Sequence, residues 1–174
     1  MNSPIFLDFE ASSMQGFPVQ VAYGSSEDNV KTFEIKPLEV WQKDTYLWDY
    51  NAESMHGLYL DYLKQHGIDA ISVAEKFSED LKGQTVYADS NMDLNWLFML
   101  LDDCAEITRH NYPMPAFQLI SELYEALDFS DSQILKSYLL ARQKFKSNGL
   151  SHHKANNDVL MHIWQWNLLR KSVY

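Results

Sequence analysis

The chain opens with short apolar runs separated by polar and glycine-containing segments, a pattern typical of β-strands. Residues 5–9 form a first apolar run with one charge, residues 17–24 form a second, and residues 32–35 form a third that ends at Lys36-Pro37. A loop over residues 11–16 and a polar turn over residues 25–29 separate these runs. The pattern predicts three consecutive strands in a meander.

Beyond a predicted loop through Trp41 and Trp48, the apolar residues recur at helical spacing. The elements predicted there are a helix ending at Gly67, a helix from Ile71 to Gly83, a strand over residues 85–88, a mostly buried helix over 92–104, a helix over 116–127, a helix capped by Asp131 and running to Phe145, and a last helix after Ser151. This order of elements predicts an α/β fold in which helices flank a mixed sheet.

Composition is that of an ordinary globular protein. With 174 residues, 46% of them hydrophobic and 14% aromatic, the chain is expected to form one domain over residues 1–174. The single cysteine, Cys104, excludes an internal disulfide and a zinc site built from several thiolates. The N-terminus lacks a basic region followed by an apolar stretch, and no apolar run is long enough to span a membrane. We therefore expect a cytoplasmic protein with no membrane partner.

Charge is unevenly distributed along the chain. The formal net charge is −10, which argues against a protein that wraps long duplex nucleic acid by charge alone. Residues 136–174 nevertheless contain seven cations and one anion, whereas the first 135 residues contain seven cations and 23 anions. A basic stretch of this kind is either a solvated helical face or a surface that attracts phosphates.

Four acidic residues are the candidates for chemistry. Asp8 and Glu10 flank Phe9 on the first strand, so the period of two places both carboxylates on one face. Two carboxylates at the end of an apolar strand repel each other and favour a bound cation, although such a strand end can also simply emerge into solvent. Asp93 follows the fourth strand and Asp158 precedes the last helix. Each could equally be an acid in the first turn of a helix, with no role in chemistry.

Four segments occur in an informative order. They are Phe6-Leu7-Asp8-Phe9-Glu10, Met55-His56-Gly57-Leu58, the segment 86–97 that contains Asp93, and His153-Lys154-Ala155-Asn156-Asn157-Asp158. In order and separation they resemble the motifs of the DEDD exonucleases of the ribonuclease H-like superfamily, in the subgroup that includes proofreading exonucleases, ribonuclease T and oligoribonuclease. The chain departs from the usual pattern at Ala11, where family members often have Thr, and at Asp89-Ser90, which replaces a common His-Asn.

The resemblance implies a ribonuclease H-like sheet and a 3'-5' exonuclease that releases nucleoside 5'-monophosphates by a two-metal mechanism. It implies that Asp8 bridges two ions, that Glu10 and Asp158 hold the ion that activates water, and that Asp93 reaches the site partly through waters. Oxygen ligands favour Mg²⁺ or Mn²⁺, and two such ions about 3.5–4 Å apart can activate the water and stabilise the leaving oxygen.

His153 is the general base that the resemblance implies, because an imidazole with a pKa of about 6.5 is largely neutral near pH 7. Residues five positions apart lie about 140° apart around a helix. His153 and Asp158 therefore cannot face one site from a single regular helix. We predict that His153 lies on the loop or first turn and that Asp158 lies on the helix.

Further residues are expected to contact the substrate, which would be a single-stranded or short nucleic acid with a free 3' end. The candidates are Ser12, Met14, Phe17, His56, Asn91, Arg142, Lys144, Lys146 and Lys154. Phe17 could equally belong to the core, and His56 could equally be structural. The resemblance also implies a homodimer. Two alternatives stay open: a catalytically silent nucleic-acid- or protein-binding module of the same fold, and an endonuclease of the same superfamily.

Overall fold

The computed structural model describes residues 3–43 and 47–171. In this part of the chain a six-stranded sheet has the order β4-β3-β2-β1-β5-β6. The strands are β1 (Ile5–Ala11), β2 (Pro18–Gly24), β3 (Lys31–Lys36), β4 (Ile68–Asp69), β5 (Thr85–Ala88) and β6 (Ala116–Leu119). Strands β1, β2 and β3 form the predicted antiparallel meander, whereas β5 runs parallel to β1 and β6 runs parallel to β5. The sheet is therefore mixed, and β1 lies near its centre.

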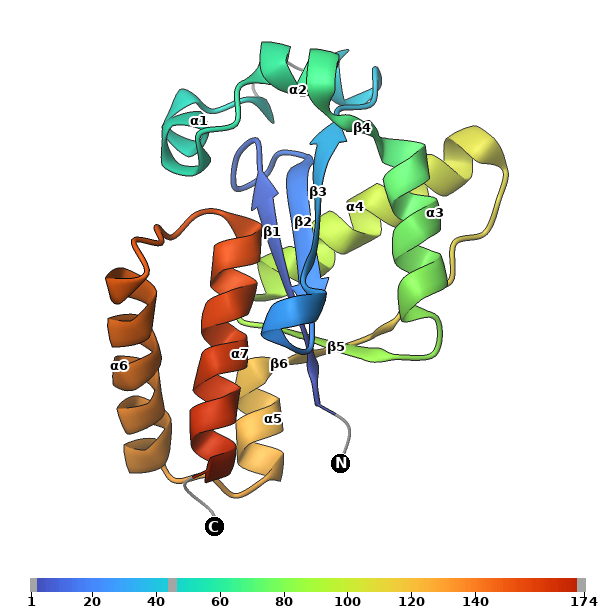
Figure 1. Ribbon diagram of the computed structural model, residues 1–174. Coiled ribbons are helices and arrows are strands. Elements are labelled where there is room, and N and C mark those ends of the chain that lie inside the picture. The colour runs from blue at the N-terminus through green and yellow to red at the C-terminus, as the bar shows by residue number, and fades with distance from the viewer. Residues whose placement is uncertain (1–2, 44–46, 172–174) are drawn as a thin grey trace.

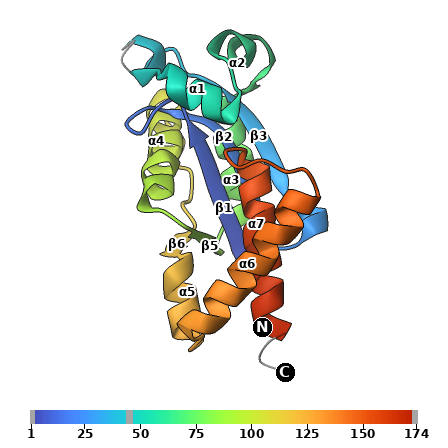
Figure 2. The same ribbon diagram turned by 90° about the vertical axis from the view of Figure 1, so that its left-hand side faces the viewer.

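Helices cover both faces of this sheet (Figure 1). They are α1 (Tyr50–His56), α2 (Leu60–His66), α3 (Ala70–Leu81), α4 (Asn91–Thr108), α5 (Ile120–Ala126), α6 (Asp131–Ser147) and α7 (Ala155–Lys171). Helices α3 and α4 lie on one face, and α5 and α7 lie on the other. Helix α6 packs against α7 as an outer layer, through Phe145 of α6 and Trp164 of α7 (Figure 2).

Alternation along β1 divides its side chains between two cores. Leu7 and Phe9 belong to the large core beneath α3 and α4, whereas Phe6 belongs to the core shared with α5 and α7. Asp8 and Glu10 share the face of Phe6 because side chains two apart point the same way. The strand is thus apolar on its α7 side where it begins and acidic on that side where it ends.

The structure corrects three of the predicted elements. Residues 116–119 were expected to begin a helix, but they form β6, which pairs with β5, and the helix begins at Ile120. Ser130, not Asp131, caps α6, and its hydroxyl accepts a hydrogen bond from the Gln133 amide. The helix predicted to end at Gly67 is preceded by a separate helix, α1 over residues 50–56, which the prediction did not include and which Asp49 caps. Most of α1 is exposed, so it lacks the apolar periodicity by which a helix is predicted.

Within the residues that the structure describes, no helix combines the length and the apolar character needed to cross a bilayer.

We expect Phe77→Ala to lower the free energy of unfolding by about 3–5 kcal/mol, because it opens a cavity in the large core. Phe77 is fully buried on α3, and its ring meets Tyr23 edge-on at 5.2 Å. Urea denaturation of the variant measures this change. Phe98→Ala, on an exposed part of α4, is the matched control and should alter stability by less than about 1 kcal/mol. Equal effects of the two substitutions would contradict the assigned core.

Candidate active site

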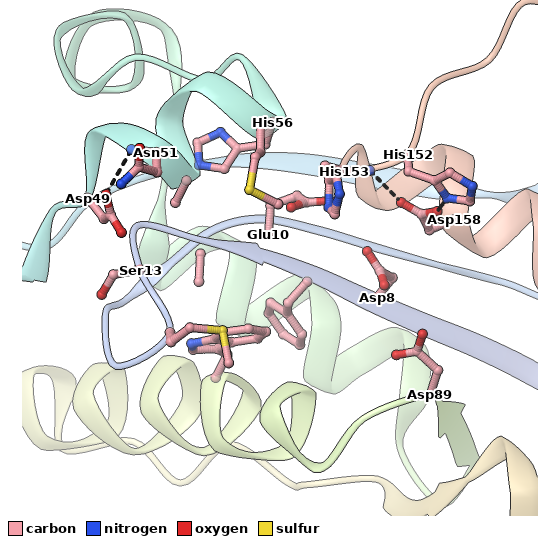
Figure 3. Close-up of a pocket in the computed structure, with 16 residues that line it drawn as sticks. Asp8, Glu10, Ser13, Asp49, Asn51, His56, Asp89, His152, His153 and Asp158 are labelled. Carbon is pink, nitrogen blue, oxygen red and sulfur yellow. Dashed lines mark hydrogen bonds and ion pairs between the residues drawn. The ribbon is translucent and has the colours of Figure 1, made fainter.

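Three carboxylates meet where β1 ends (Figure 3). Asp8 and Glu10 come from β1, and Asp158 comes from the first turn of α7. Each offers an oxygen that lies within 4.8 Å of an oxygen of each of the others. Segments 150 residues apart in the sequence therefore supply one oxygen-rich cluster.

A buried hydrogen bond fixes the start of α7 beside this cluster. The amide of Ala155, the first residue of α7, donates to Gln20 Oε1 at 2.9 Å. Gln20 lies on β2 directly opposite Glu10. Because α7 begins at this point of the sheet, its first turn brings Asp158 to the end of β1.

Asp93 reaches the same region from another direction. It lies in the first turn of α4 and is 3% exposed, and its Oδ1 accepts a hydrogen bond from the Phe9 amide at 2.9 Å. One of its oxygens is thus committed to the backbone of β1. Its charge still acts on the cluster, since it is the strongest of the neighbouring charges that raise the pKa of Asp8.

Burial and the charges of neighbouring acids raise the pKa values of Asp8, Glu10 and Asp93. The pKa of Asp8 is raised well above its usual value, first by burial and then by Asp93, Asp158 and Glu10. Burial, followed by the charges of Asp158 and Asp93, raises the pKa of Glu10 to about 8. Burial and the charge of Asp89 raise the pKa of Asp93 to about 7. Near neutral pH, the cluster therefore favours a proton or a cation as its neighbour.

The cluster suits a hard divalent cation. Asp8 Oδ2 is buried and makes no hydrogen bond among the described residues. A buried carboxylate oxygen without a donor is costly unless a cation approaches it. The atoms available as metal ligands are carboxylate oxygens, which Mg²⁺ and Mn²⁺ prefer. Most zinc sites use nitrogen and sulfur ligands instead. Asp8, Glu10 and Asp158 are thus the residues that could hold such an ion.

Two histidines of the α6–α7 loop bind the carboxylate of Asp158. His152 Nδ1 lies 2.7 Å from Asp158 Oδ1, and the backbone amide of His153 donates to Asp158 Oδ2 at 2.9 Å (Figure 3). His152 also stacks on Phe145, with ring centroids 4.6 Å apart. His153 has a φ of 61°, a left-handed conformation that no regular helix contains. His153 therefore lies on the loop and Asp158 on the helix, as their spacing predicts.

The cluster forms one end of a pocket of about 500 Å³. Asp8, Glu10, Asp158 and Asp89 line its acidic end, together with His152 and His153. The rest of the lining is mainly apolar and includes Ala11, Met14, Ala52, Met55 and Trp96. A volume of this size with a few converging polar groups is typical of a small-molecule site.

His56 forms a wall of the pocket from the end of α1. The side chain is buried, and its Nδ1 accepts a hydrogen bond from the Leu58 amide at 3.0 Å. Burial lowers the pKa of the ring, so it is neutral near pH 7. Gly57 follows in the left-handed conformation, with φ of 72°, and ends α1 directly after the ring.

Two of the predicted substrate contacts, Ser12 and Phe17, are buried and have partners within the protein. Ser12 is fully buried, and its hydroxyl donates to the Leu47 carbonyl at 2.6 Å and accepts from the Phe17 amide at 2.9 Å. Phe17 is also buried and stacks on Trp41 with centroids 5.6 Å apart. Both side chains hold the loop after β1 in place. Ser13 and Met14 line the pocket from this loop, and Met14 is 69% exposed.

The predicted basic lip does not reach the pocket. Lys144 binds Glu27 at 3.0 Å and lies over the ring of Trp164, on the far side of α7. Arg142 and Lys146 are exposed on α6, and neither they nor Asn91 line the pocket. Lys154 lines a neighbouring hollow. Arg142 and Lys146 lie on the exposed face of α6, whereas Glu27 and Trp164 hold Lys144 away from the pocket.

Comparison with protein families and with curated proteins gives no match. Solved structures of exonuclease I from E. coli do match. They include the zinc-bound complex with single-stranded DNA (TM-score 0.62, 17% identity) and the complex with a dA16 oligonucleotide (TM-score 0.59, 15% identity). Each match covers 98% of this chain and 41% of the other.

The fold is ribonuclease H-like. This confirms the fold class predicted from the sequence motifs, a mixed sheet with an opening meander and flanking helices. At such low identity the similarity concerns the fold alone. The chain also spans about two fifths of the length of these exonuclease I chains.

The pocket residues that were not predicted include Asp89, His152, Met55 and Trp96. Asp89 directly follows β5, and Trp96 lies one turn into α4, so the position of the second motif was a usable signal for both. Met55 belongs to α1, which the apolar pattern does not reveal. His152 precedes His153 in the sequence, and this position gives no indication of the bond to Asp158.

We expect the free energy of unfolding of the cation-free protein to fall as the pH rises from about 5 to about 8. The pKa of Glu10 is about 8 in the folded chain and about 4.3 in an unfolded one. The folded state therefore binds more protons across this window, and it loses that stabilisation as they dissociate.

Urea denaturation in EDTA at the two pH values measures this fall, and Glu10→Gln should reduce it. Glu39→Gln, at an exposed acid outside the pocket, should leave it unchanged. A fall that persists in full in Glu10→Gln would show that Glu10 is not a source of the pH dependence.

Proposed function

We propose that the chain is a divalent-cation-dependent 3'-5' exonuclease of the DEDD type, acting on single-stranded or short nucleic acid and releasing nucleoside 5'-monophosphates. The observation that carries this proposal is the cluster of Asp8, Glu10 and Asp158 at one end of a pocket that is mainly apolar elsewhere. Cleavage of the terminal nucleotide needs charge stabilisation at the phosphate and an apolar surface for the base. The 3'-5' direction rests on the resemblance of the motifs, which also supports a homodimer.

Asp8, Glu10 and Asp158 would hold Mg²⁺ or Mn²⁺, and Asp93 would assist through water because one of its oxygens binds the Phe9 amide. When bound, two such ions lower the pKa of water and offset the charge that develops on the phosphate. The raised pKa values of Asp8 and Glu10 would fall in turn, because a cation stabilises the ionised carboxylates.

His153 would act as the general base. It lines the pocket beside Glu10, and its backbone bond to Asp158 fixes the loop that carries it (Figure 3). Its imidazole takes a proton from the attacking water as the oxygen bonds to phosphorus. The bond between phosphorus and the 3'-oxygen breaks, and that oxygen takes up a proton from solvent. The products are a shortened strand and a nucleoside 5'-monophosphate.

The apolar part of the pocket would hold the terminal base. Met14 lies on the loop after β1, Met55 lies on α1, and Trp96 lies on α4. Flexible thioethers adapt to different base shapes, and an indole ring offers a stacking surface. This arrangement would accept all bases rather than select one.

A 5'-labelled single-stranded oligonucleotide tests the proposed activity. With Mg²⁺ or Mn²⁺ we expect a ladder of products that differ by one nucleotide, and EDTA or Asp8→Asn should abolish it. Asp61→Asn, at an exposed acid of α2, is the matched control and should retain full activity. No ladder on either DNA or RNA would refute the proposal.

Two further outcomes separate the alternatives. Cleavage of a circular single strand would identify an endonuclease, because an exonuclease needs a free end. Calorimetric binding of an oligonucleotide without any turnover would identify a silent binding module.

His153→Ala should lower turnover by about 10²- to 10⁴-fold, the usual contribution of a general base. Mn²⁺ binding, measured by calorimetry, should remain because the three carboxylates are unchanged. His152→Ala removes the ring bound to Asp158 and should have the smaller effect on turnover. If His152→Ala caused the larger loss instead, the base would be His152.

A further inference from the structure

A second hollow, of about 720 Å³, adjoins the candidate active site. His56 lines both hollows, so its buried ring stands between them. The second hollow lies between the start of α2, the strands β2 and β3, and the loop that leads into α7. Figure 2 shows this loop rising toward α1 and α2 at the same end of the sheet. The two hollows therefore lie next to each other, on either side of His56.

Two exposed tyrosines line this hollow from the start of α2. Tyr59 is 59% exposed and Tyr62 is 44% exposed. Neighbours hold Tyr62 in position, because its ring packs on His66 with centroids 4.9 Å apart and a hydrogen bond to Glu34 raises the pKa of its hydroxyl. Exposed aromatic rings next to a candidate site indicate a binding surface.

The hollow is also lined by a lysine whose ammonium group is available to a ligand. Lys154 lines it from the residue before α7, and no ion pair engages its ammonium group among the described residues. Glu34 is the one acid of the lining, and the hydroxyl of Tyr62 already binds it. Unpaired bases can stack on the tyrosine rings, and the phosphates that join them can contact the lysine.

We propose that this hollow binds the nucleotides on the 5' side of the scissile phosphodiester. Their bases stack on Tyr59 and Tyr62, and a backbone phosphate contacts Lys154. The proposal rests on the proposed exonuclease function and adds a binding site for several unpaired nucleotides upstream of the bond that is cleaved. A paired strand does not fit, because its bases are already stacked and paired and cannot lie on the tyrosine rings.

The test compares two substrates. The p-nitrophenyl ester of thymidine 5'-monophosphate fills only the pocket, whereas a single-stranded decamer also fills the second hollow. In the double variant Tyr59→Ala/Tyr62→Ala, KM for the decamer should rise at least about fivefold, since each stacked base contributes at least that factor. The rate of ester hydrolysis should not change.

Two control variants separate stacking from structure. Tyr50→Ala removes an exposed tyrosine of α1 that lines neither hollow, and it should leave both substrates unaffected. Tyr59→Phe keeps the ring and should retain the wild-type KM for the decamer. Lys154→Met should weaken decamer binding and reduce its salt dependence by about 0.7 in the logarithmic slope.

The outcomes distinguish this proposal from the proposed function. If the wild type cleaves both substrates and the double variant keeps the wild-type KM for the decamer, the second hollow does not bind the strand, while the exonuclease function stands. If the wild type cleaves neither substrate, the exonuclease function fails, and fluorescence anisotropy with the labelled decamer decides the second hollow. Equal affinities of wild type and double variant would then overturn the proposal.

Discussion

Repulsion among buried carboxylates is the constraint on which this structure depends. Asp8, Glu10 and Asp158 meet at one end of β1, and Asp93 lies beside them with one oxygen on the Phe9 amide. Burial and the neighbouring charges oppose the ionisation of Asp8, Glu10 and Asp93, so the cluster is unfavourable unless protons or cations neutralise it. An arrangement of this kind stores binding energy for a cation at the expense of the stability of the cation-free fold.

The cores on the two faces of the sheet maintain this arrangement. Helix α7 is fixed by apolar residues such as Val159 and Ile163, and α4 is fixed by Leu97 and Leu100. Burial of an aliphatic side chain contributes roughly 1.5–3 kcal/mol, so a few such residues on each helix outweigh the repulsion at its first turn. The acids are therefore held by packing elsewhere along their own elements, not by contacts to one another.

The α6–α7 loop links the acidic cluster to the surfaces around it. Its histidines bind both oxygens of Asp158, and Lys154 follows them directly. The loop contacts the core through His152, which stacks on Phe145 of α6. At the end of α1, the buried ring of His56 lies between the pocket and the second hollow. The proposed general base, His153, and the proposed phosphate contact, Lys154, thus lie on one short segment that these contacts hold in place.

Local periodicity was enough to predict part of this site. A period of two places Asp8 and Glu10 on one face, and five-residue spacing places His153 on a loop and Asp158 on a helix. The motif order likewise predicted the ribonuclease H-like sheet. These properties depend on the geometry of a single element or on the order of elements along the chain, and both can be obtained from the sequence.

Only the tertiary structure decided which side chains meet. It placed an oxygen of Asp93 on the Phe9 amide, buried Ser12 in the loop after β1 and directed Lys144 toward Glu27. It also brought Asp89 to the acidic end of the pocket. The direction of a side chain follows from its own element, but its partner follows from how distant elements pack, and that packing depends on the whole core at once.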